Sequence, residues 1–177
     1  MERPPYDLTI SEAGRAIRAG DLTSAALTES VLTRIEETEP QLNAYIEITA
    51  ELAKKQAHAA DSDLKAGHDR GPLQGVPIAF KDLFDVEGIA TTGGSAYLRE
   101  NFPEHDAFVV QRLREAGAVF IGKLGLHEFA MGTTNNNPHF GPVHNPWDLS
   151  HIPGGSSGGS GAAVAAGSCI GALGTDT

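Results

Sequence analysis

Apolar positions recur with a helical period in three stretches of the first third of the chain. Residues 9–12 read TISE, the capping-box spacing that starts a helix, and Gly20 is placed to end that helix. Apolar side chains spaced by four between residues 27 and 35 predict a second, amphipathic helix that ends before Pro40. The alanine-rich stretch 50–66 predicts a third helix.

Short apolar runs between and after these helices predict strands. Residues 44–48 alternate apolar and polar side chains, whereas residues 76–80 form a continuous apolar run that contains Pro77, which lacks a donor for sheet pairing. Residues 118–121 form a clearer strand, and the stretch between the last two runs predicts a helix from Asp106 through Glu115. A strand–helix–strand rhythm of this kind favours a layered α/β fold with some parallel pairing.

A glycine- and serine-rich run stands near the end of the sequence. It reads GGSSGGSG at positions 154–161 and leads directly into AAVAA at 162–166. Such a composition also occurs in flexible linkers, but linkers do not usually lead into small apolar residues. We interpret the run as a close-approach loop that leads into a buried helix.

Four segments, in this order, resemble motifs of the amidase signature family, serine hydrolases with a Ser–cis-Ser–Lys triad. The segments are GVPIAFKD at 75–82, GKLGLHEFAMG at 122–132, FGPVHNPWD at 140–148, and GGSSGGSG at 154–161 followed by GTDT at 174–177. One glycine-rich match would be weak, whereas four ordered matches are specific. The resemblance implies a partial amidase-signature fold, with a mixed β-sheet core flanked by helices.

The resemblance assigns catalytic roles to Lys81 and Ser156. Lys81 directly follows an apolar run, and burial there would lower its pKa so that the amine could act as a base. The alternative for Lys81 is a surface lysine whose stem packs on the sheet edge. Ser156 matches the family's cis-serine, which implies a cis Gly155–Ser156 bond and a hydroxyl relay; Ser157 is the competing assignment.

Substrate contacts are also implied only by the resemblance. Met131 and Gly132 match a segment that lines the acyl pocket, with ordinary packing as the alternative. Backbone N–H groups around Thr177 would help to hold the oxyanion, and the nucleophilic serine would be the third residue after Thr177. Residues 1–177 are therefore expected to be the N-terminal part of a single amidase domain, inactive when expressed alone.

Composition excludes several other classes. The formal net charge of −10 argues against direct binding of nucleic acid or of an anionic membrane. Cys169 is the only cysteine, so no intramolecular disulfide can form, and no histidine spacing fits a zinc site. We expect no metal and no cofactor. No stretch approaches 18 apolar residues and no leader is evident, so the expected location is the cytoplasm.

The sequence leaves three functions open. The first is a free-standing amidase that hydrolyses the C–N bond of a small amide substrate through a serine acyl-enzyme, with a homodimer as the partner to consider. The second is the glutaminase component of a tRNA-dependent amidotransferase, to which residues 128–132 are equally suited and which would bring partner subunits. The third is a non-catalytic truncated fragment.

Overall fold

Four strands form a mixed sheet in the computed structural model, which describes residues 3–176. Their order across the sheet is β1 (Tyr45–Ile48), β3 (Val119–Leu124), β2 (Pro77–Lys81) and β6 (Gly171–Leu173). The central strand β2 runs parallel to both β3 and β6, and β1 pairs antiparallel with β3. The expected α/β fold with a mixed sheet and parallel pairing is confirmed.

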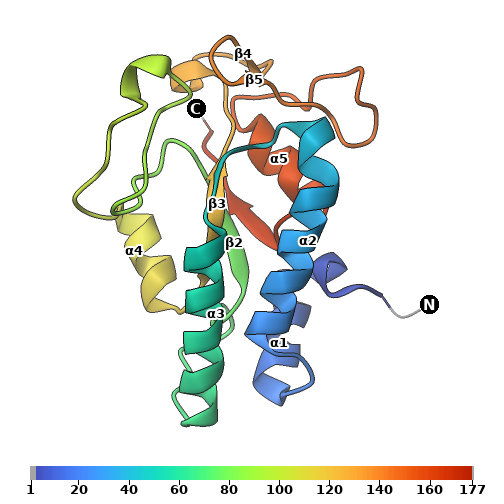
Figure 1. Ribbon diagram of the computed structural model, residues 1–177, viewed down its shortest axis with the longest axis vertical. Coiled ribbons are helices and arrows are strands. Elements are labelled where there is room, and N and C mark those ends of the chain that lie inside the picture. The colour runs from blue at the N-terminus through green and yellow to red at the C-terminus, as the bar shows by residue number, and fades with distance from the viewer. Residues whose placement is uncertain (1–2, 177) are drawn as a thin grey trace.

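Five α-helices of the described chain flank this sheet. They are α1 (Ile10–Ala19), α2 (Ser24–Leu42), α3 (Ala50–Lys65), α4 (Phe108–Glu115) and α5 (Gly158–Ala165). Figure 1 shows α2 and α3 side by side in front of the strands, with α4 to one side, α5 to the other, and most loops gathered at the upper end. The short elements are η1 (Pro5–Asp7), η2 (Ala96–Leu98), η3 (Glu128–Ala130), and the hairpin of β4 (Asn136–Asn137) and β5 (Gly141–Pro142).

Helix α1 begins and ends where its sequence signals lie. The Thr9 hydroxyl accepts a hydrogen bond from the Glu12 amide, and the Glu12 carboxylate accepts one from the Thr9 amide. Gly20 closes the other end with φ of +81°. The local chemistry of capping alone therefore determines both boundaries of this helix.

Two predicted helix boundaries are wrong, and the first is the end of α2. This helix continues through Pro40 to Leu42. Pro40 lies in the last turn, where its missing N–H removes only one hydrogen bond from the helix. The Asn43 amide then donates to the Glu39 carbonyl and ends the helix.

The second wrong boundary is the start of α4, which Asp106 does not cap. The Asp106 carboxylate instead accepts hydrogen bonds from the Arg114 guanidinium at 2.5 and 2.8 Å and from the Glu87 amide at 2.8 Å. These charged and backbone donors come from outside the first turn of the helix, which begins at Phe108 after an Ala107 that offers no side-chain cap.

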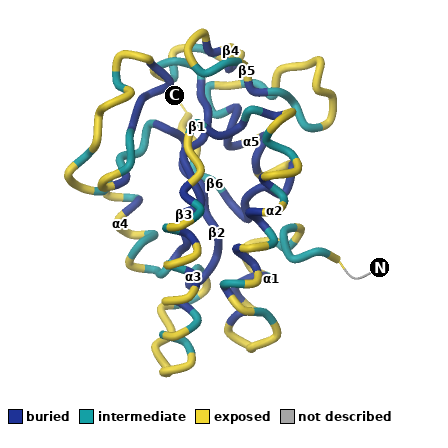
Figure 2. Tube along the Cα trace, in the orientation of Figure 1, coloured by how far each residue is buried: buried dark blue, intermediate teal, exposed yellow. Residues whose placement is uncertain are grey.

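The core lies along the central strands. All five residues of β2 and all six of β3 are buried, and the dark centre of Figure 2 follows these strands. The rings of Phe80 and Phe120 meet edge to face with centroids 4.6 Å apart. Pro77 stands first in β2, the position in a strand where a missing donor is tolerated.

Helix α5 packs so closely on the sheet that it has no room for a side chain on its inner face. A Cβ on Gly159 would lie 2.5 Å from the Gly125 carbonyl oxygen and 2.7 Å from that of Ala44. Both obstacles are backbone atoms, which cannot rotate away. The glycine-rich run is therefore a close-approach segment leading into a helix, and the linker interpretation is wrong.

The two glycines on opposite sides of α5 should respond oppositely to alanine. Gly159→Ala is expected to destabilise the chain by about 1–3 kcal/mol, because the new methyl group overpacks the backbone contact. Gly161 is exposed, and a Cβ there would meet nothing within 4 Å. Gly161→Ala should therefore stabilise the helix by about 0.5–1 kcal/mol. Urea unfolding of both variants checks this, and equal effects would contradict the packing.

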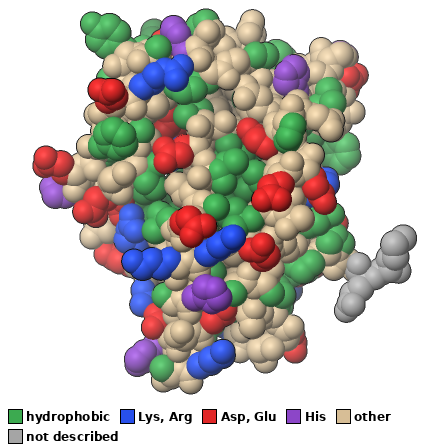
Figure 3. Space-filling view, in the orientation of Figure 1, with side chains coloured by type: hydrophobic (Ala, Val, Ile, Leu, Met, Phe, Trp, Pro, Cys, Tyr) green, Lys and Arg blue, Asp and Glu red, His purple; other side chains and the backbone are tan. Residues whose placement is uncertain are grey.

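The surface carries charge of both signs. On the face shown in Figure 3, acidic and basic side chains lie interspersed over the helices. Within residues 3–176, no helix is both long enough and apolar enough to cross a membrane. Cys169 is buried, and this burial raises the pKa of its thiol to about 12, which suits a small packing residue.

Candidate active site

Lys81 is the last residue of β2, and its side chain is buried with 0% of its surface exposed. Its ammonium nitrogen contacts two hydroxyl groups. Nζ donates hydrogen bonds to Ser156 Oγ at 2.7 Å and to Thr175 Oγ1 at 2.5 Å. Lys81 is therefore not the surface lysine that the sequence left open.

Ser156 reaches Lys81 from a segment 75 residues away in sequence. The Gly155–Ser156 peptide bond is cis, as the resemblance implied. The Ser156 carbonyl accepts a hydrogen bond from the His127 amide at 3.1 Å. A Cβ on Gly155 would lie only 3.0 Å from the Asn135 amide nitrogen, so the segment packs directly on the neighbouring backbone.

Thr175 completes the group and was not predicted as a site residue. Strand β6 pairs with β2 through Phe80 and Leu173, so the residues just beyond the two strands are neighbours. The Ser157 hydroxyl accepts a hydrogen bond from the Thr175 amide and donates one to the Thr175 carbonyl, at 3.1 and 3.2 Å. Ser157 therefore holds the segment that carries Thr175, whereas Ser156 contacts Lys81.

The arrangement can move a proton between an amine and hydroxyl groups. Burial lowers the pKa of Lys81, because removing water penalises the charged ammonium. A neutral amine has a lone pair and can accept the proton of a neighbouring hydroxyl. Within residues 3–176, no three His, Cys, Asp or Glu side chains gather in a way that could hold a metal ion.

The predicted pocket residues lie on the segment next to Ser156. Met131 is 83% exposed, and no hydrogen bond within the described chain joins it to Lys81. Gly132 packs against the ring of His127, whose backbone amide contacts Ser156. The structure therefore places Met131 and Gly132 beside the serine segment without joining them to the Lys81 group. Thr177 lies outside the residues that the structure describes.

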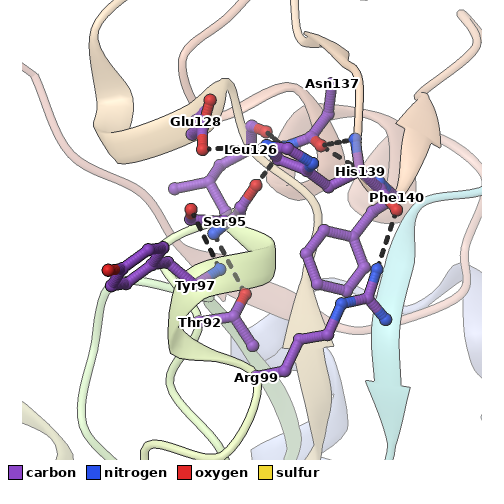
Figure 4. A network of polar contacts seen from close by, with 10 residues as sticks. Thr92, Ser95, Tyr97, Arg99, Leu126, Glu128, Asn137, His139 and Phe140 are labelled. Atoms are coloured by element: carbon purple, nitrogen blue, oxygen red, sulfur yellow. Dashed lines mark hydrogen bonds and ion pairs between the residues drawn. The ribbon is translucent and has the colours of Figure 1, made fainter.

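A network of polar contacts holds this neighbouring segment. Figure 4 shows Asn137 between residues of two loops: its side-chain amide donates to the carbonyls of Gly94 and Leu126, at 2.7 and 3.1 Å. His139 Nε2 lies 3.1 Å from Glu128 Oε1, and Arg99 donates to the His139 carbonyl at 2.9 Å. These contacts fix the loops around residues 94, 128 and 139 against one another.

A buried ion pair beneath the site was also missed by the sequence reasoning. Lys123 Nζ lies 2.7 Å from Asp82 Oδ1, with side-chain exposures of 1% and 0%. The signal was present, since both charged residues interrupt apolar strand runs, in FKD and IGKL. Charged residues in such runs are rarely buried unless they are paired.

The chain is similar to known proteins over most of its length. One of them is a protein of Halorhodospira halophila (strain DSM 244 / SL1) named as the A component of glutamyl-tRNA(Gln) amidotransferase. The two are 53% identical over 172 residues, which cover 97% of this chain and 35% of that protein. The chain therefore spans about a third of the length of the curated relatives that it matches.

Solved structures have the same fold. The crystal structure of an amidase is 42% identical with a TM-score of 0.87, covering 96% of this chain and 39% of that chain. Fatty acid amide hydrolase is 28% identical with a TM-score of 0.93, covering 99% of this chain and 32% of that chain. The family model described as Amidase matches residues 26–177, and the chain therefore belongs to the amidase family, the amidase-signature enzymes that act on C–N bonds.

Proposed function

We propose that residues 1–177 serve as the N-terminal part of a single amidase domain in a protein of the relatives' length, called here the full-length protein. In it, the chain would help to hydrolyse a carboxylic amide through a serine acyl-enzyme. One observation carries this proposal: Lys81 Nζ and Ser156 Oγ, from two separate family motifs, lie 2.7 Å apart in a buried group.

Lys81 acts in this proposal as the base and Ser156 as the relay. Neutral Lys81 takes the proton of the Ser156 hydroxyl, which in turn takes the proton of the nucleophilic serine expected beyond Thr177. The serine oxygen bonds to the amide carbonyl carbon. The C–N bond then breaks, and the proton returns through Ser156 to the departing nitrogen. Water releases the acyl group by the same route.

Thr175 and the neighbouring segment support these steps. Thr175 Oγ1 holds the Lys81 amine from a second side, which fixes the direction of its lone pair. Met131, exposed beside the serine segment, is free to contact the acyl part of a substrate, and Gly132 shapes the turn next to it. Backbone N–H groups around Thr177 would face the oxyanion.

A second candidate is the glutaminase component of a tRNA-dependent amidotransferase. The curated relatives favour it, because eight of them, at 47–53% identity, carry the name of the A component of glutamyl-tRNA(Gln) amidotransferase. In this case the substrate is glutamine and the full-length protein works with partner subunits. The solved amidase structure at 42% identity favours the first candidate, with a small amide and a homodimer as the alternative assembly.

Ammonia release separates these candidates. The full-length protein is assayed alone with glutamine and with a panel of simple amides, and hydroxylamine is added to trap the acyl group as a hydroxamate. Release from simple amides supports a free-standing amidase, whereas release from glutamine alone supports the amidotransferase component. A folded full-length protein that releases no ammonia and forms no hydroxamate would contradict both and leave the non-catalytic alternative.

A further inference from the structure

The buried ion pair of Asp82 and Lys123 lies on the far side of the strand that carries Lys81. Phe80 of β2 stands opposite Lys123 of β3 in the sheet register, and Lys81 stands opposite Leu124. Successive side chains along a strand point to opposite faces. Lys81 therefore points to the face where Ser156 lies, and Asp82 points to the face that it shares with Lys123.

Both charged groups are satisfied by close partners. Lys123 Nζ lies 2.7 Å from Asp82 Oδ1 and donates to the Ala90 carbonyl and the Thr91 hydroxyl, at 2.9 and 2.8 Å. Asp82 Oδ2 accepts hydrogen bonds from the amide and the hydroxyl of Thr92. The pair therefore fastens residues 90–92 to the ends of β2 and β3.

The same loop continues toward the segment that carries Met131. The Asp82 carbonyl accepts a hydrogen bond from the Gly93 amide at 3.0 Å, and the Gly93 carbonyl accepts one from the Phe129 amide at 2.7 Å. Thr92 appears in Figure 4 beside the loops that Asn137 joins. Asp82 thus connects the end of β2, where Lys81 stands, to the loop beside Ser156.

We propose that Asp82 and Lys123 are positioning residues for Lys81, which fix the end of β2 and keep the net charge behind the amine at zero. This inference rests on the proposed function of Lys81 as the base. A buried carboxylate one residue away would favour the ammonium form of Lys81 and remove its lone pair. The Lys123 charge cancels that effect, and in a site shielded from water each charge acts strongly.

Few other ionisable groups within residues 3–176 border Lys81 on the elements around it. His127 belongs to the segment bonded to Ser156, and Asp176 follows Thr175 and is exposed to solvent. Solvent screens an exposed carboxylate more than a buried one. Asp82 and Lys123 are therefore the charges whose removal should act on Lys81 most directly.

The test is the pH dependence of kcat/KM in the full-length protein, on the acid side where Lys81 loses its proton. Lys123→Met leaves Asp82 uncompensated, so the midpoint should rise by about one pH unit, roughly a tenfold loss of rate on that limb. Asp82→Asn leaves the Lys123 charge, so the midpoint should fall by a similar amount, about one unit. The double variant should restore the parental midpoint, and Lys123→Arg, which keeps the charge, should stay near it.

The surface pair Arg112–Glu115, 2.8 Å apart and about half exposed or more, provides matched controls. Arg112→Met and Glu115→Gln should leave the midpoint unchanged. If Lys123→Met does not fold, Asp82→Asn and the double variant still give the sign, since a neutral buried pair is tolerated better than a lone charge. Shifts of both single variants in one direction, or none at all, overturn the inference. Full activity of Lys81→Ala, measured in parallel, would instead overturn the proposed function.

Discussion

Replacing Lys81 by alanine in the full-length protein is expected to lower kcat by about 10²–10⁴-fold, the range for loss of a general base. Lys81 is the amine that contacts the Ser156 hydroxyl at 2.7 Å, and alanine offers no proton acceptor in its place. Ammonia release under saturating substrate gives the number. Circular dichroism confirms that the variant is folded before its rate is compared.

A surface lysine provides the control for this variant. Lys65 ends helix α3 and is exposed. Lys65→Ala changes the same side chain outside the site and should leave kcat within about twofold, since exposed substitutions rarely act at a distance. A Lys81→Ala protein that keeps the parental turnover would falsify the assignment of the base.

Replacing Ser156 by alanine should cost a similar amount, about 10²–10³-fold in kcat, because the proton path from the nucleophile to Lys81 is broken. The serine oxygen lies at hydrogen-bond distance from Lys81, and no other serine in residues 3–176 contacts that nitrogen. Single-turnover measurements of acyl-enzyme formation test the step directly, because the loss should appear before water enters the reaction.

The neighbouring Ser157 distinguishes relay from support. Ser157 bonds to the backbone of Thr175, so Ser157→Ala should loosen that segment by about 1 kcal/mol for each lost hydrogen bond. The expected loss of rate is about tenfold, well below that of Ser156→Ala. If Ser157→Ala proves the more damaging change, the alternative assignment considered from the sequence is the correct one.

Local signals predicted the parts of the fold that depend on a few adjacent residues. The caps of α1 follow from Thr9 and Gly20 alone, and the burial of β2 follows from its unbroken apolar run. The prediction was wrong where a distant group decides the outcome. Asp106 carries the chemistry of a helix cap, yet Arg114 and the Glu87 amide occupy its carboxylate.

The candidate site divides in the same way. Family motifs pointed to Lys81 and Ser156, which the structure brings together, although their roles stay predictions. Thr175 could not be singled out, because its contact with Lys81 exists only once β6 lies beside β2. The pairing of Asp82 with Lys123 likewise depends on the register of two strands, which no short stretch of sequence encodes.

The central place of β2 also has a consequence for biosynthesis. Ile78 pairs with Phe120 on one side and with Gly171 on the other. A ribosome adding roughly 5–20 residues per second therefore exposes β2 with one open edge for several seconds after β3 has emerged. Unpaired strand edges are templates for association between chains. Nascent chains of this protein should therefore depend on chaperones during that interval, until β6 is synthesised.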